Sequence, residues 1–390
     1  MKAVILAAGE GQRLRPFTAN KPKVMIKVGN KPILEYVVDA LKEAGIREIV
    51  MVVGYKKERV IDYFGNGEKF GVKIEYVTQK QQLGTAHALK QAKDLVEGKF
   101  LVLPGDNIID SETLKDVLSY DTFSVVYKVV EEPTKYGVLE VENGKVKRII
   151  EKPEEEVSYL ASTGIYLLDD RIFEFIGDER DLTNVVNVMI ESGIDFFTVE
   201  SKGLWLDIVY PWDILKVNDL ALKHKGKSIA GKVESGVTIV GDVVIGEGSI
   251  IRSGSFIKGP VIIGVNSEIG ANSVILPSTS IGDNTKVEEF CRIENCVIGE
   301  NVVIGADSYV RDSVIDSGTI FEPKIVTISE SAEVKVDGEL RKVKSGAFVG
   351  EGCKIGAGSV LRGGAVIGNR CEIAPLKVIC GKIDDVAKVL

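Results

Sequence analysis

The sequence is poor in histidine, has no long apolar run and carries no excess of positive charge. Only two of its 390 residues are histidines, His87 and His224. No apolar stretch approaches the roughly 20 residues that span a bilayer, and the opening run Met1 to Leu6 is too short for a secretory signal. A net charge of −8 argues against duplex binding, which needs clustered Lys and Arg. We expect a cytoplasmic protein with neither nucleic-acid nor membrane partners.

Paired cysteines are also missing. All five cysteines lie in the second half of the chain, and none forms a C-x-x-C pair: Cys291, Cys296, Cys353, Cys371 and Cys380. This pattern predicts reduced thiols in structural positions rather than a metal cluster. With 45% hydrophobic and 27% charged residues, the chain has the composition of an enzyme with two well-formed cores.

The second half has a six-residue period. Aliphatic residues occupy every sixth position in one long series: Ile239, Ile245, Ile251, Ile257, Ile263, Ile269, Ile275, Ile281, Val287 and Ile293. The register slips once, to Ile298, and breaks down near Phe321. A polar stretch from Glu322 to Ser345 then falls outside the pattern, which resumes at Val349. This period predicts a solenoid built from hexapeptides, with the polar stretch as an insertion on one face.

The first half alternates β-rich and helical stretches. Strands are expected at residues 4–7, 49–54, 74–77 and 100–104, and helices at 33–44, 57–64 and 85–96. Such alternation predicts an α/β domain whose mostly parallel sheet is covered on both faces. Residues 123–168 read as consecutive strands that add to the sheet in antiparallel fashion, and 211–223 as a helix before a linker at 224–227. We therefore place two domains at residues 1–225 and 226–390.

A glycine-rich turn follows the first strand. Gly9 and Gly11 lie in the run from Leu6 to Pro16, where glycine lets backbone N–H groups approach a phosphate closely. Position 14 is leucine, so the dinucleotide fingerprint fails, and no Gly-Lys-Ser/Thr follows, so a P-loop fails as well. The turn instead carries Arg13, with Lys23 ten residues later. Two cations near such a turn suit a triphosphate whose departing pyrophosphate needs its charge neutralised.

The run from Leu6 to Lys23 resembles the signature of the sugar-1-phosphate nucleotidyltransferases. Many members of this family join a Rossmann-like catalytic domain to a left-handed parallel β-helix of hexapeptide repeats, so the resemblance covers the whole chain. It implies that Arg13 and Lys23 are the catalytic cations. The nucleotide would be held by these residues: Leu6, Ala7, Ala8, Gly9, Gly11, Gln79, Gly84 and Thr85. Gln79 would read the base, because a side-chain amide offers both a donor and an acceptor.

The same resemblance implies a metal site and a sugar site. Asp106, at the end of a predicted strand, and Asp207 would hold Mg²⁺, although Ile208-Val209 departs from the small residues that often follow Asp207 in the family. The sugar would contact Gly137, Glu151, Lys152 and Thr163. Glu151 would accept from sugar hydroxyls and Lys152 would meet the sugar phosphate. Ser162 stands where the family often has asparagine, which leaves the sugar's 2-substituent open.

The implied reaction transfers a nucleotidyl group from UTP or dTTP to N-acetylglucosamine or glucose 1-phosphate, with a nucleoside triphosphate and a sugar 1-phosphate as partners. Three alternatives stay open: a mannose-1-phosphate guanylyltransferase, a regulatory subunit without activity, and a bifunctional enzyme that also acetylates glucosamine 1-phosphate. The acetyl transfer usually needs a histidine base, and none lies between residues 225 and 390. We otherwise expect the β-helix to form a homo-trimer or a dimer of trimers.

Overall fold

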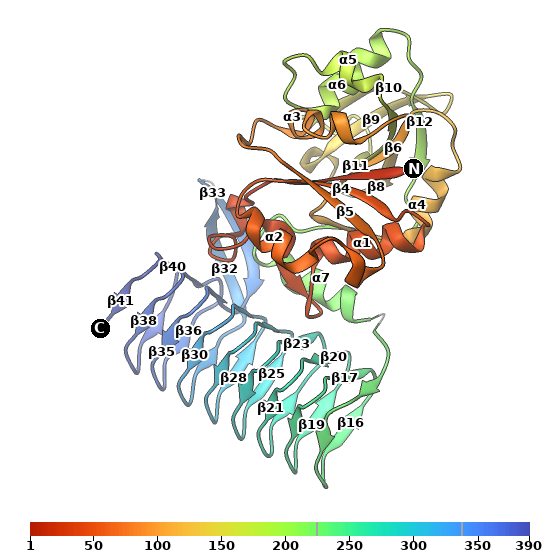
Figure 1. The fold of residues 1–390 in the computed structure, drawn as a ribbon. Coiled ribbons are helices and arrows are strands. Elements are labelled where there is room, and N and C mark those ends of the chain that lie inside the picture. The colour runs from red at the N-terminus through yellow and green to blue at the C-terminus, as the bar shows by residue number, and fades with distance from the viewer. Residues whose placement is uncertain (224, 337) are drawn as a thin grey trace. The chain divides into compact units, whose positions relative to one another are not determined.

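The computed structural model describes residues 1–223, 225–336 and 338–390, which form two compact units (Figure 1). The first unit contains residues 1–10, 21–25 and 33–207, and the second contains 11–20, 26–32 and 208–390. Two short N-terminal segments therefore belong to the otherwise C-terminal unit. His224, in the predicted linker, lies outside the described residues. Among the helices that the structure describes, none is long and apolar enough to cross a membrane.

The first unit is built on a mixed nine-stranded sheet. In spatial order its strands are β5 (Lys73–Thr78), β4 (Glu48–Val53), β1 (Lys2–Ala7), β6 (Lys99–Pro104), β11 (Leu160–Asp169), β8 (Ser124–Val129), β12 (Phe197–Glu200), β10 (Lys145–Glu151) and β9 (Gly137–Glu142). Strands β5, β4, β1 and β6 are parallel neighbours, as are β8 and β12. Strands β11 and β10 pair with their neighbours in antiparallel fashion, as the consecutive strand signals predict.

Helices cover both faces of this sheet. One face carries α1 (Ile33–Glu43), α2 (Lys57–Phe64) and α4 (Ser111–Leu118), and the other carries α3 (Thr85–Lys90), α5 (Ile172–Ile176) and α6 (Leu182–Glu191). Alternate side chains of a strand point to opposite faces. In β1, Ile5 therefore packs in the α1 core while Val4 packs in the α3 core. Because both faces are buried, the central strands are apolar throughout, and this confirms the predicted α/β class.

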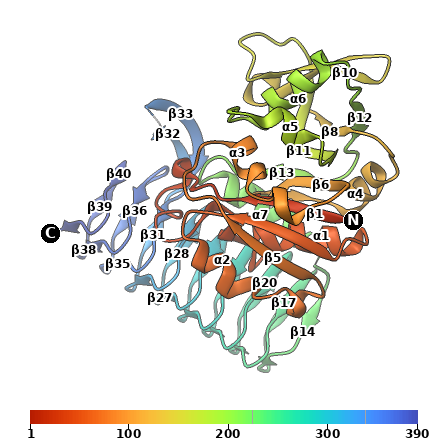
Figure 2. The same cartoon turned by 45° about the horizontal axis from the view of Figure 1, so that its top comes forward.

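The second unit is a parallel β-helix with three sheets, whose stacked coils appear in Figure 2. The first sheet contains β14 (Ser228–Ile229), β17 (Val243–Ile245), β20 (Val261–Ile263), β23 (Thr279–Ile281), β26 (Val297–Ile298), β29 (Val314–Ile315), β34 (Phe348–Val349), β37 (Val366–Ile367) and β40 (Lys382–Ile383). The second contains β15 (Lys232–Val233), β18 (Ile250–Ile251), β21 (Glu268–Ile269), β24 (Lys286–Val287), β27 (Val303–Ile304), β30 (Ile320–Phe321), β35 (Lys354–Ile355), β38 (Glu372–Ile373) and β41 (Lys388–Val389). The third contains β16 (Thr238–Val240), β19 (Phe256–Lys258), β22 (Val274–Ile275), β25 (Arg292–Glu294), β28 (Tyr309–Arg311), β31 (Val326–Thr327), β36 (Val360–Leu361) and β39 (Val378–Ile379).

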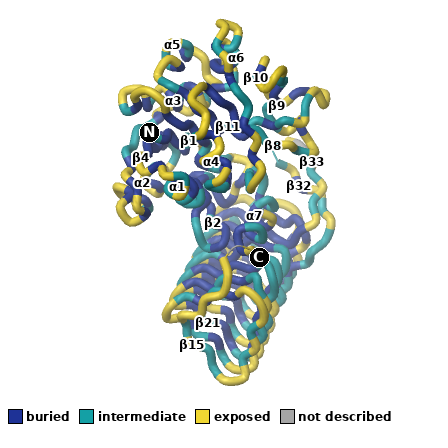
Figure 3. Tube along the Cα trace, turned by 90° about the vertical axis from the view of Figure 1, so that its right-hand side faces the viewer, coloured by how far each residue is buried: buried dark blue, intermediate teal, exposed yellow. Residues whose placement is uncertain are grey.

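The six-residue period fixes the register between coils. Three hexapeptides complete one turn, so Ile245 pairs with Ile263 and Ile263 with Ile281. These side chains fill the interior of the solenoid and are almost fully buried (Figure 3). Pairing continues across the predicted slip, where Ile281 meets Ile298. The predicted hexapeptide architecture, a left-handed β-helix, is confirmed.

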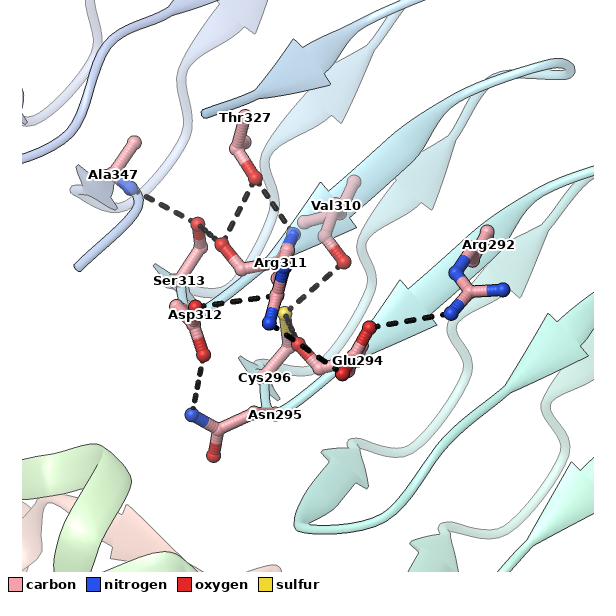
Figure 4. Close-up of polar contacts among 10 residues, drawn as sticks. All are labelled: Arg292, Glu294, Asn295, Cys296, Val310, Arg311, Asp312, Ser313, Thr327 and Ala347. Carbon is pink, nitrogen blue, oxygen red and sulfur yellow. Dashed lines mark hydrogen bonds and ion pairs between the residues drawn. The ribbon is translucent and has the colours of Figure 1, made fainter. Parts of the chain in front are cut away.

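Small polar side chains satisfy the backbone at the corners of the solenoid (Figure 4). Ser313 Oγ accepts from the Ala347 N–H at 2.9 Å, and Thr327 Oγ1 accepts from the Arg311 N–H at 2.7 Å. Asn295 Nδ2 donates to Asp312 Oδ1 at 2.6 Å, linking successive coils at one corner. Buried backbone groups need such partners wherever the strand ladder ends. The four buried cysteines, all free, fill interior positions as expected, while Cys380 is exposed.

Two predicted boundaries are wrong. The insertion is shorter than the stretch from Glu322 to Ser345, because β31 still occupies a regular solenoid position. Only the hairpin of β32 (Glu330–Val336) and β33 (Glu339–Ser345) leaves the pattern, with residue 337 outside the described part. The helix expected at 85–96 ends at Lys90 and gives way to a 3₁₀ turn, η4 (Lys93–Leu95), because the Gln91 N–H bonds back to Ala88 as well as Leu89.

Candidate active site

Lys23 lies between the two carboxylates that the sequence assigns to a metal. Its Nζ donates to Asp106 Oδ2 at 2.6 Å and to Asp207 Oδ1 at 2.9 Å. The Lys23 side chain is 14% exposed, whereas those of Asp106 and Asp207 are 32% and 21% exposed. The cluster is thus reachable from solvent through its acidic members. All three residues belong to the first unit.

Strand pairing explains why the two carboxylates meet. Asp106 lies two residues beyond β6, and the next strand, β7 (Asn107–Ile109), pairs in antiparallel fashion with β13 (Trp205–Asp207). The register places Asp207 opposite Asn107 and therefore beside Asp106. The Asn107 amide, oriented to satisfy both of its ends, donates to Asp106 O at 3.3 Å and accepts from Trp205 Nε1 at 3.1 Å. Asn107 thus links the backbone of Asp106 to β13, the strand that carries Asp207.

The electrostatics of this cluster keep Lys23 charged. Burial by itself lowers the pKa of a lysine, but the attraction and hydrogen bonds of Asp106 and Asp207 outweigh it, so the pKa of Lys23 is raised above its ordinary value. A permanent ammonium group beside two carboxylates can neutralise added phosphate charge without taking part in proton transfer.

The glycine-rich turn begins in the first unit. Strand β1 carries Leu6 and Ala7, and Ala8 follows with its carbonyl accepting from Gln82 Nε2 at 2.9 Å. Apart from its chain neighbours, no atom of the described residues lies within 4 Å of a Cβ built at Gly9. The space beside Gly9 is therefore open, as the approach of a phosphate to the backbone requires.

The second half of the turn belongs to the other unit. Gly11 has a φ of +77°, a conformation that favours glycine, and leads into the 3₁₀ turn η1 (Gln12–Leu14) that carries Arg13. Thr18 Oγ1 donates to Gly11 O at 2.8 Å and is fully buried. The two predicted catalytic cations therefore fall in different compact units, Arg13 in the second and Lys23 in the first.

Gln79 shapes the loop that the sequence assigns to base recognition. It is 4% exposed, and its Nε2 contacts both Gly84 O at 3.0 Å and His87 Nδ1 at 2.9 Å. Gly84 has a φ of +103°, and a Cβ there would lie 2.4 Å from Arg180 O. Thr85 Oγ1 accepts from the Leu182 N–H at 2.8 Å. The amide oxygen of Gln79 takes part in neither of these contacts.

The structure brings together three of the four predicted sugar residues. In the β9–β10 ladder Gly137 lies opposite Glu151, and a Cβ on Gly137 would approach Glu151 Oε2 to 2.7 Å. Lys152 follows with a φ of +42°, unusual for a residue with a side chain, and its N–H donates to Tyr136 O at 3.1 Å. The Tyr136 ring packs edge-on against Trp205 with centroids 5.2 Å apart, which joins this region to the strand of Asp207.

Thr163 lies in an irregular part of β11. The pairing of β11 with β8 shifts between Ser162 and Tyr166, and Gly164 there has a φ of +76°. The Thr163 hydroxyl donates to Val126 O at 2.9 Å and the residue is 2% exposed. Its buried hydroxyl, which also accepts from the Ile165 N–H at 3.3 Å, therefore stabilises the bulge.

Comparison with known proteins identifies the family. The nucleotidyl transferase family model matches residues 2–224, more than half of the chain. The chain belongs to this family. In its second half, the model of the GMPPB C-terminal domain matches residues 257–348, and the bacterial transferase hexapeptide model matches residues 346–381. The chain is thus an enzyme of the nucleotidyltransferase class, and the predicted family is confirmed.

Relatives of this nucleotidyltransferase share both halves. It is 38% identical over 390 residues to the bifunctional protein GlmU of Methanococcus maripaludis, covering 96% of this chain and 93% of the relative. It is 35% identical to the bifunctional sugar-1-phosphate nucleotidylyltransferase/acetyltransferase of Sulfurisphaera tokodaii, over 97% of each chain. A crystal structure of a putative glucose-1-phosphate thymidylyltransferase from Bacillus anthracis is 31% identical, with a TM-score of 0.53, covering 57% of this chain and 95% of that one.

Sequence reasoning missed two supporting residues of this nucleotidyltransferase. Neither Gln82, which donates to Ala8 O, nor Asn107, which bonds to Asp106 O and Trp205, is singled out by the sequence. Asn107 had a signal, because it directly follows Asp106 at the end of a predicted strand. Gln82 had none, because its partner lies 74 positions away.

Proposed function

We propose that the chain transfers a nucleotidyl group from UTP or dTTP to N-acetylglucosamine or glucose 1-phosphate, giving a nucleoside-diphosphate sugar and pyrophosphate. The observation that carries this proposal is the position of Lys23 between Asp106 and Asp207 in the first unit. We assign the chemistry to residues 1–225. The names of the relatives, which include sugar-1-phosphate nucleotidyltransferases, support the choice of substrates.

The reaction needs charge stabilisation more than proton transfer. A phosphate oxygen of the sugar 1-phosphate, already an anion at neutral pH, attacks the α-phosphorus, and the bond from that phosphorus to the β-phosphate bridging oxygen breaks as pyrophosphate leaves. No general base is required. Lys23 holds positive charge beside the reacting phosphates and Arg13 binds the departing pyrophosphate. Glu151 accepts hydrogen bonds from the sugar hydroxyls, and Lys152 pairs with the sugar phosphate.

The acidic pair fits a divalent cation. Magnesium is usually held by one or two carboxylates, with substrate phosphates and water completing its shell. Asp106 and Asp207 supply two carboxylates whose oxygens flank a single atom, Lys23 Nζ. We propose that these two aspartates hold Mg²⁺ and that, when bound, the ion withdraws charge from the α-phosphate. Without the ion, the Lys23 ammonium group offsets part of the negative charge of the two carboxylates.

The test is pyrophosphate release by the full chain in Mg²⁺, with five nucleoside triphosphates against four sugar 1-phosphates. We expect turnover confined to UTP or dTTP with glucose or N-acetylglucosamine 1-phosphate. Preference for GTP and mannose 1-phosphate would establish the guanylyl alternative instead. Asp106→Asn and Arg13→Ala should each abolish release. Full activity in either variant would refute the site, and a silent wild type would favour a regulatory subunit.

Acetyl transfer is a second candidate function. The hexapeptide match at residues 346–381 and the two bifunctional relatives favour it. The sequence from residue 225 onward contains no histidine, so the base would be another group, such as a carboxylate near the β32–β33 hairpin. Release of free coenzyme A from acetyl-CoA and glucosamine 1-phosphate tests this activity, and no release above a protein-free blank would exclude it.

We also propose that the β-helix assembles into a homo-trimer or a dimer of trimers. Its hexapeptide sheets support this, because flat solenoid faces can pack about a closed rotation axis. Light scattering on the eluting protein gives the mass directly. A monomer mass near 42.3 kDa at micromolar concentration would contradict the proposal.

A further inference from the structure

Side chains of the β-helix form hydrogen bonds with the segment that carries Arg13. Asn369 Nδ2 donates to Pro16 O at 3.2 Å, a buried contact across 353 positions of the sequence. Asn20 Nδ2 donates to Glu351 Oε2 at 3.1 Å. Two anchors therefore lie three and seven residues after Arg13, and they explain why residues 11–20 belong to the second unit.

The segment that follows Lys23 is anchored to the same unit. The Gly29 N–H donates to Asn218 Oδ1 at 2.8 Å, and Asn218 is fully buried on α7 (Asp213–Leu222). Asn30 Nδ2 donates to Ile281 O at 2.6 Å, and Lys27 forms an ion pair with Glu300. In the sequence, Lys23 is flanked by two segments, 11–20 and 26–32, that both belong to the second unit.

Aromatic contacts fix the segment after Asp207 to the β-helix. The rings of Tyr210 and Trp212 stack with centroids 4.8 Å apart, and Trp212 packs against Phe348 of the solenoid at 6.4 Å. The guanidinium of Arg341, on the β32–β33 hairpin, lies 5.6 Å from the Tyr210 ring centroid. The residues that directly follow Asp207 are thus fixed by the β-helix as well.

Asn369 differs from the other residues at its corner of the solenoid. Asp283, Ser317 and Asp385 each use a side-chain oxygen to accept the backbone N–H of a residue one coil earlier. Asn369 does the same through Oδ1, which accepts from the Glu351 N–H at 2.8 Å. Asp283 and Asp385 carry no donor when ionised and Ser317 has a single hydroxyl, whereas the Asn369 amide offers a separate N–H donor beside its acceptor oxygen. Asn369 is 2% exposed, and its Nδ2 donates both to Pro16 O at 3.2 Å and to Asp385 Oδ1 at 3.1 Å.

We propose that the β-helix positions Arg13, with Asn369 and Glu351 as the positioning residues. The inference rests on the proposed function, because it takes Arg13 as the group that binds pyrophosphate. Misplacement of a charged group by about 1 Å can cost about 100-fold in rate. The segment from Gly11 to Asn20 is short and holds only local turns, so the contacts of Pro16 O and the Asn20 amide with the β-helix fix where it lies.

The experiment uses the full chain and two pairs of variants. Asn369→Ser keeps an oxygen that can cap the Glu351 N–H, as Ser317 caps the Glu300 N–H two coils earlier, but it removes the amide donor to Pro16 and Asp385. Asp283→Ser places serine at the same corner, where Asp283 caps the Val265 N–H. Glu351→Ala removes the acceptor for Asn20, whereas Glu351→Gln retains a carbonyl oxygen there. Hydrogen exchange of peptides from residues 11–20 and steady-state pyrophosphate release are measured for all four.

We expect faster exchange in residues 11–20 for Asn369→Ser and Glu351→Ala, with Asp283→Ser and Glu351→Gln close to wild type. We also expect kcat to fall about tenfold or more in the first two variants, with a smaller change in the triphosphate KM, because Arg13 acts mainly on the departing pyrophosphate. Equal effects in Asn369→Ser and Asp283→Ser would reduce Asn369 to a structural cap and overturn the inference.

The two readouts separate this inference from the proposed function. Unchanged exchange in residues 11–20 overturns the inference whatever the activities are. Faster exchange with an unchanged kcat also overturns it, because the β-helix would then hold the segment without serving catalysis. A wild type that releases no pyrophosphate with any substrate pair refutes the proposed function and, with it, the catalytic role of the anchors. The exchange data then still decide whether the anchors exist.

Discussion

Lys23 solves an electrostatic problem that its two neighbours create. Two carboxylates on one site repel each other, and without a cation one of them gains a proton. Lys23 Nζ contacts both Asp106 and Asp207, so the cluster carries one excess negative charge instead of two. Under the proposed function, that residual charge would attract the divalent ion that the two aspartates are proposed to hold.

Lys23→Met tests this role at the level of one residue. The variant keeps an unbranched side chain only one atom shorter and removes its charge, so we expect kcat for pyrophosphate release to fall about 100- to 1000-fold. Stability should fall by about 1 to 2 kcal/mol, less than for a fully buried pair, because Asp106 is 32% exposed. Steady-state kinetics and urea unfolding measure the two effects. Lys99→Met, which breaks an exposed pair with Asp121, is the control and should change neither.

Gly84→Ala tests the backbone of the Gln79 loop. A Cβ at Gly84 would meet Arg180 O at 2.4 Å, and the φ of +103° disfavours any side chain. We expect a loss of about 2 to 3 kcal/mol in unfolding free energy and a higher KM for the nucleoside triphosphate. Gly98→Ala is the matched control, because Gly98 also has a positive φ, +63°, but a Cβ built there meets no atom within 4 Å outside its chain neighbours. If both variants lose the same stability, the steric role of Gly84 is wrong.

At the scale of elements, the fold of the β-helix constrains the residues at its corners more than the side chains that point outward from its strands. Corner residues repeat a left-handed backbone conformation, which asparagine and glycine adopt at low cost, as at Asn272 and Gly254. Phe290 occupies the corner position one coil after Asn272, with a φ of +58° and 61% of its surface exposed. A bulky residue in that conformation is strained, and because the ring is exposed, it contributes little hydrophobic stabilisation.

Phe290→Asn should therefore stabilise the β-helix. We expect a gain of about 0.5 to 1 kcal/mol, because asparagine tolerates the left-handed conformation better than phenylalanine does. The midpoint of chemical unfolding reports the change. Phe321→Asn is the contrast, since Phe321 is fully buried in the solenoid core and its loss should cost about 3 kcal/mol or more. A destabilised Phe290→Asn variant would show that the exposed ring has a partner worth more than its strain.

At the scale of the whole molecule, buried thiols couple stability to alkaline pH. Burial raises the pKa of Cys296 and of Cys353 to about 12 and that of Cys291 to about 11. In the unfolded chain a thiol ionises near its ordinary pKa of about 8.5. Between these values the folded chain binds more protons than the unfolded one, so stability falls as pH rises from about 9 toward 12.

The double variant Cys296→Ala/Cys353→Ala isolates this effect. It should be less stable than wild type at pH 8, because two small cavities form, but should lose less stability between pH 8 and pH 10.5. The difference amounts to at most about 1.4 kcal/mol per thiol for each pH unit above the unfolded pKa. Urea unfolding at the two pH values measures it. Parallel losses in wild type and variant would assign the alkaline instability to lysines and tyrosines instead.

Local sequence was enough for much of the architecture and part of the site. The strand before the glycine turn, the helix at residues 57–64 and the hexapeptide period follow from side-chain periodicity alone, which depends only on near neighbours. Asp106 could be found because ligand-binding residues gather at the ends of parallel strands. The end of α3 and the limits of the insertion could not be found, because short-range hydrogen bonds and coil pairing set them.

The sequence by itself determined the two architectures, the family and the charged residues of the nucleotidyltransferase, because periodicity and motifs are properties of contiguous residues. Only the tertiary structure decided which of those residues meet. Antiparallel pairing of β7 with β13 puts Asp207 beside Asp106, 101 positions earlier in the chain, and Lys23 closes on both. Asn369 reaches Pro16 across 353 positions. Such long-range contacts follow from how the elements pack, and no local pattern records them.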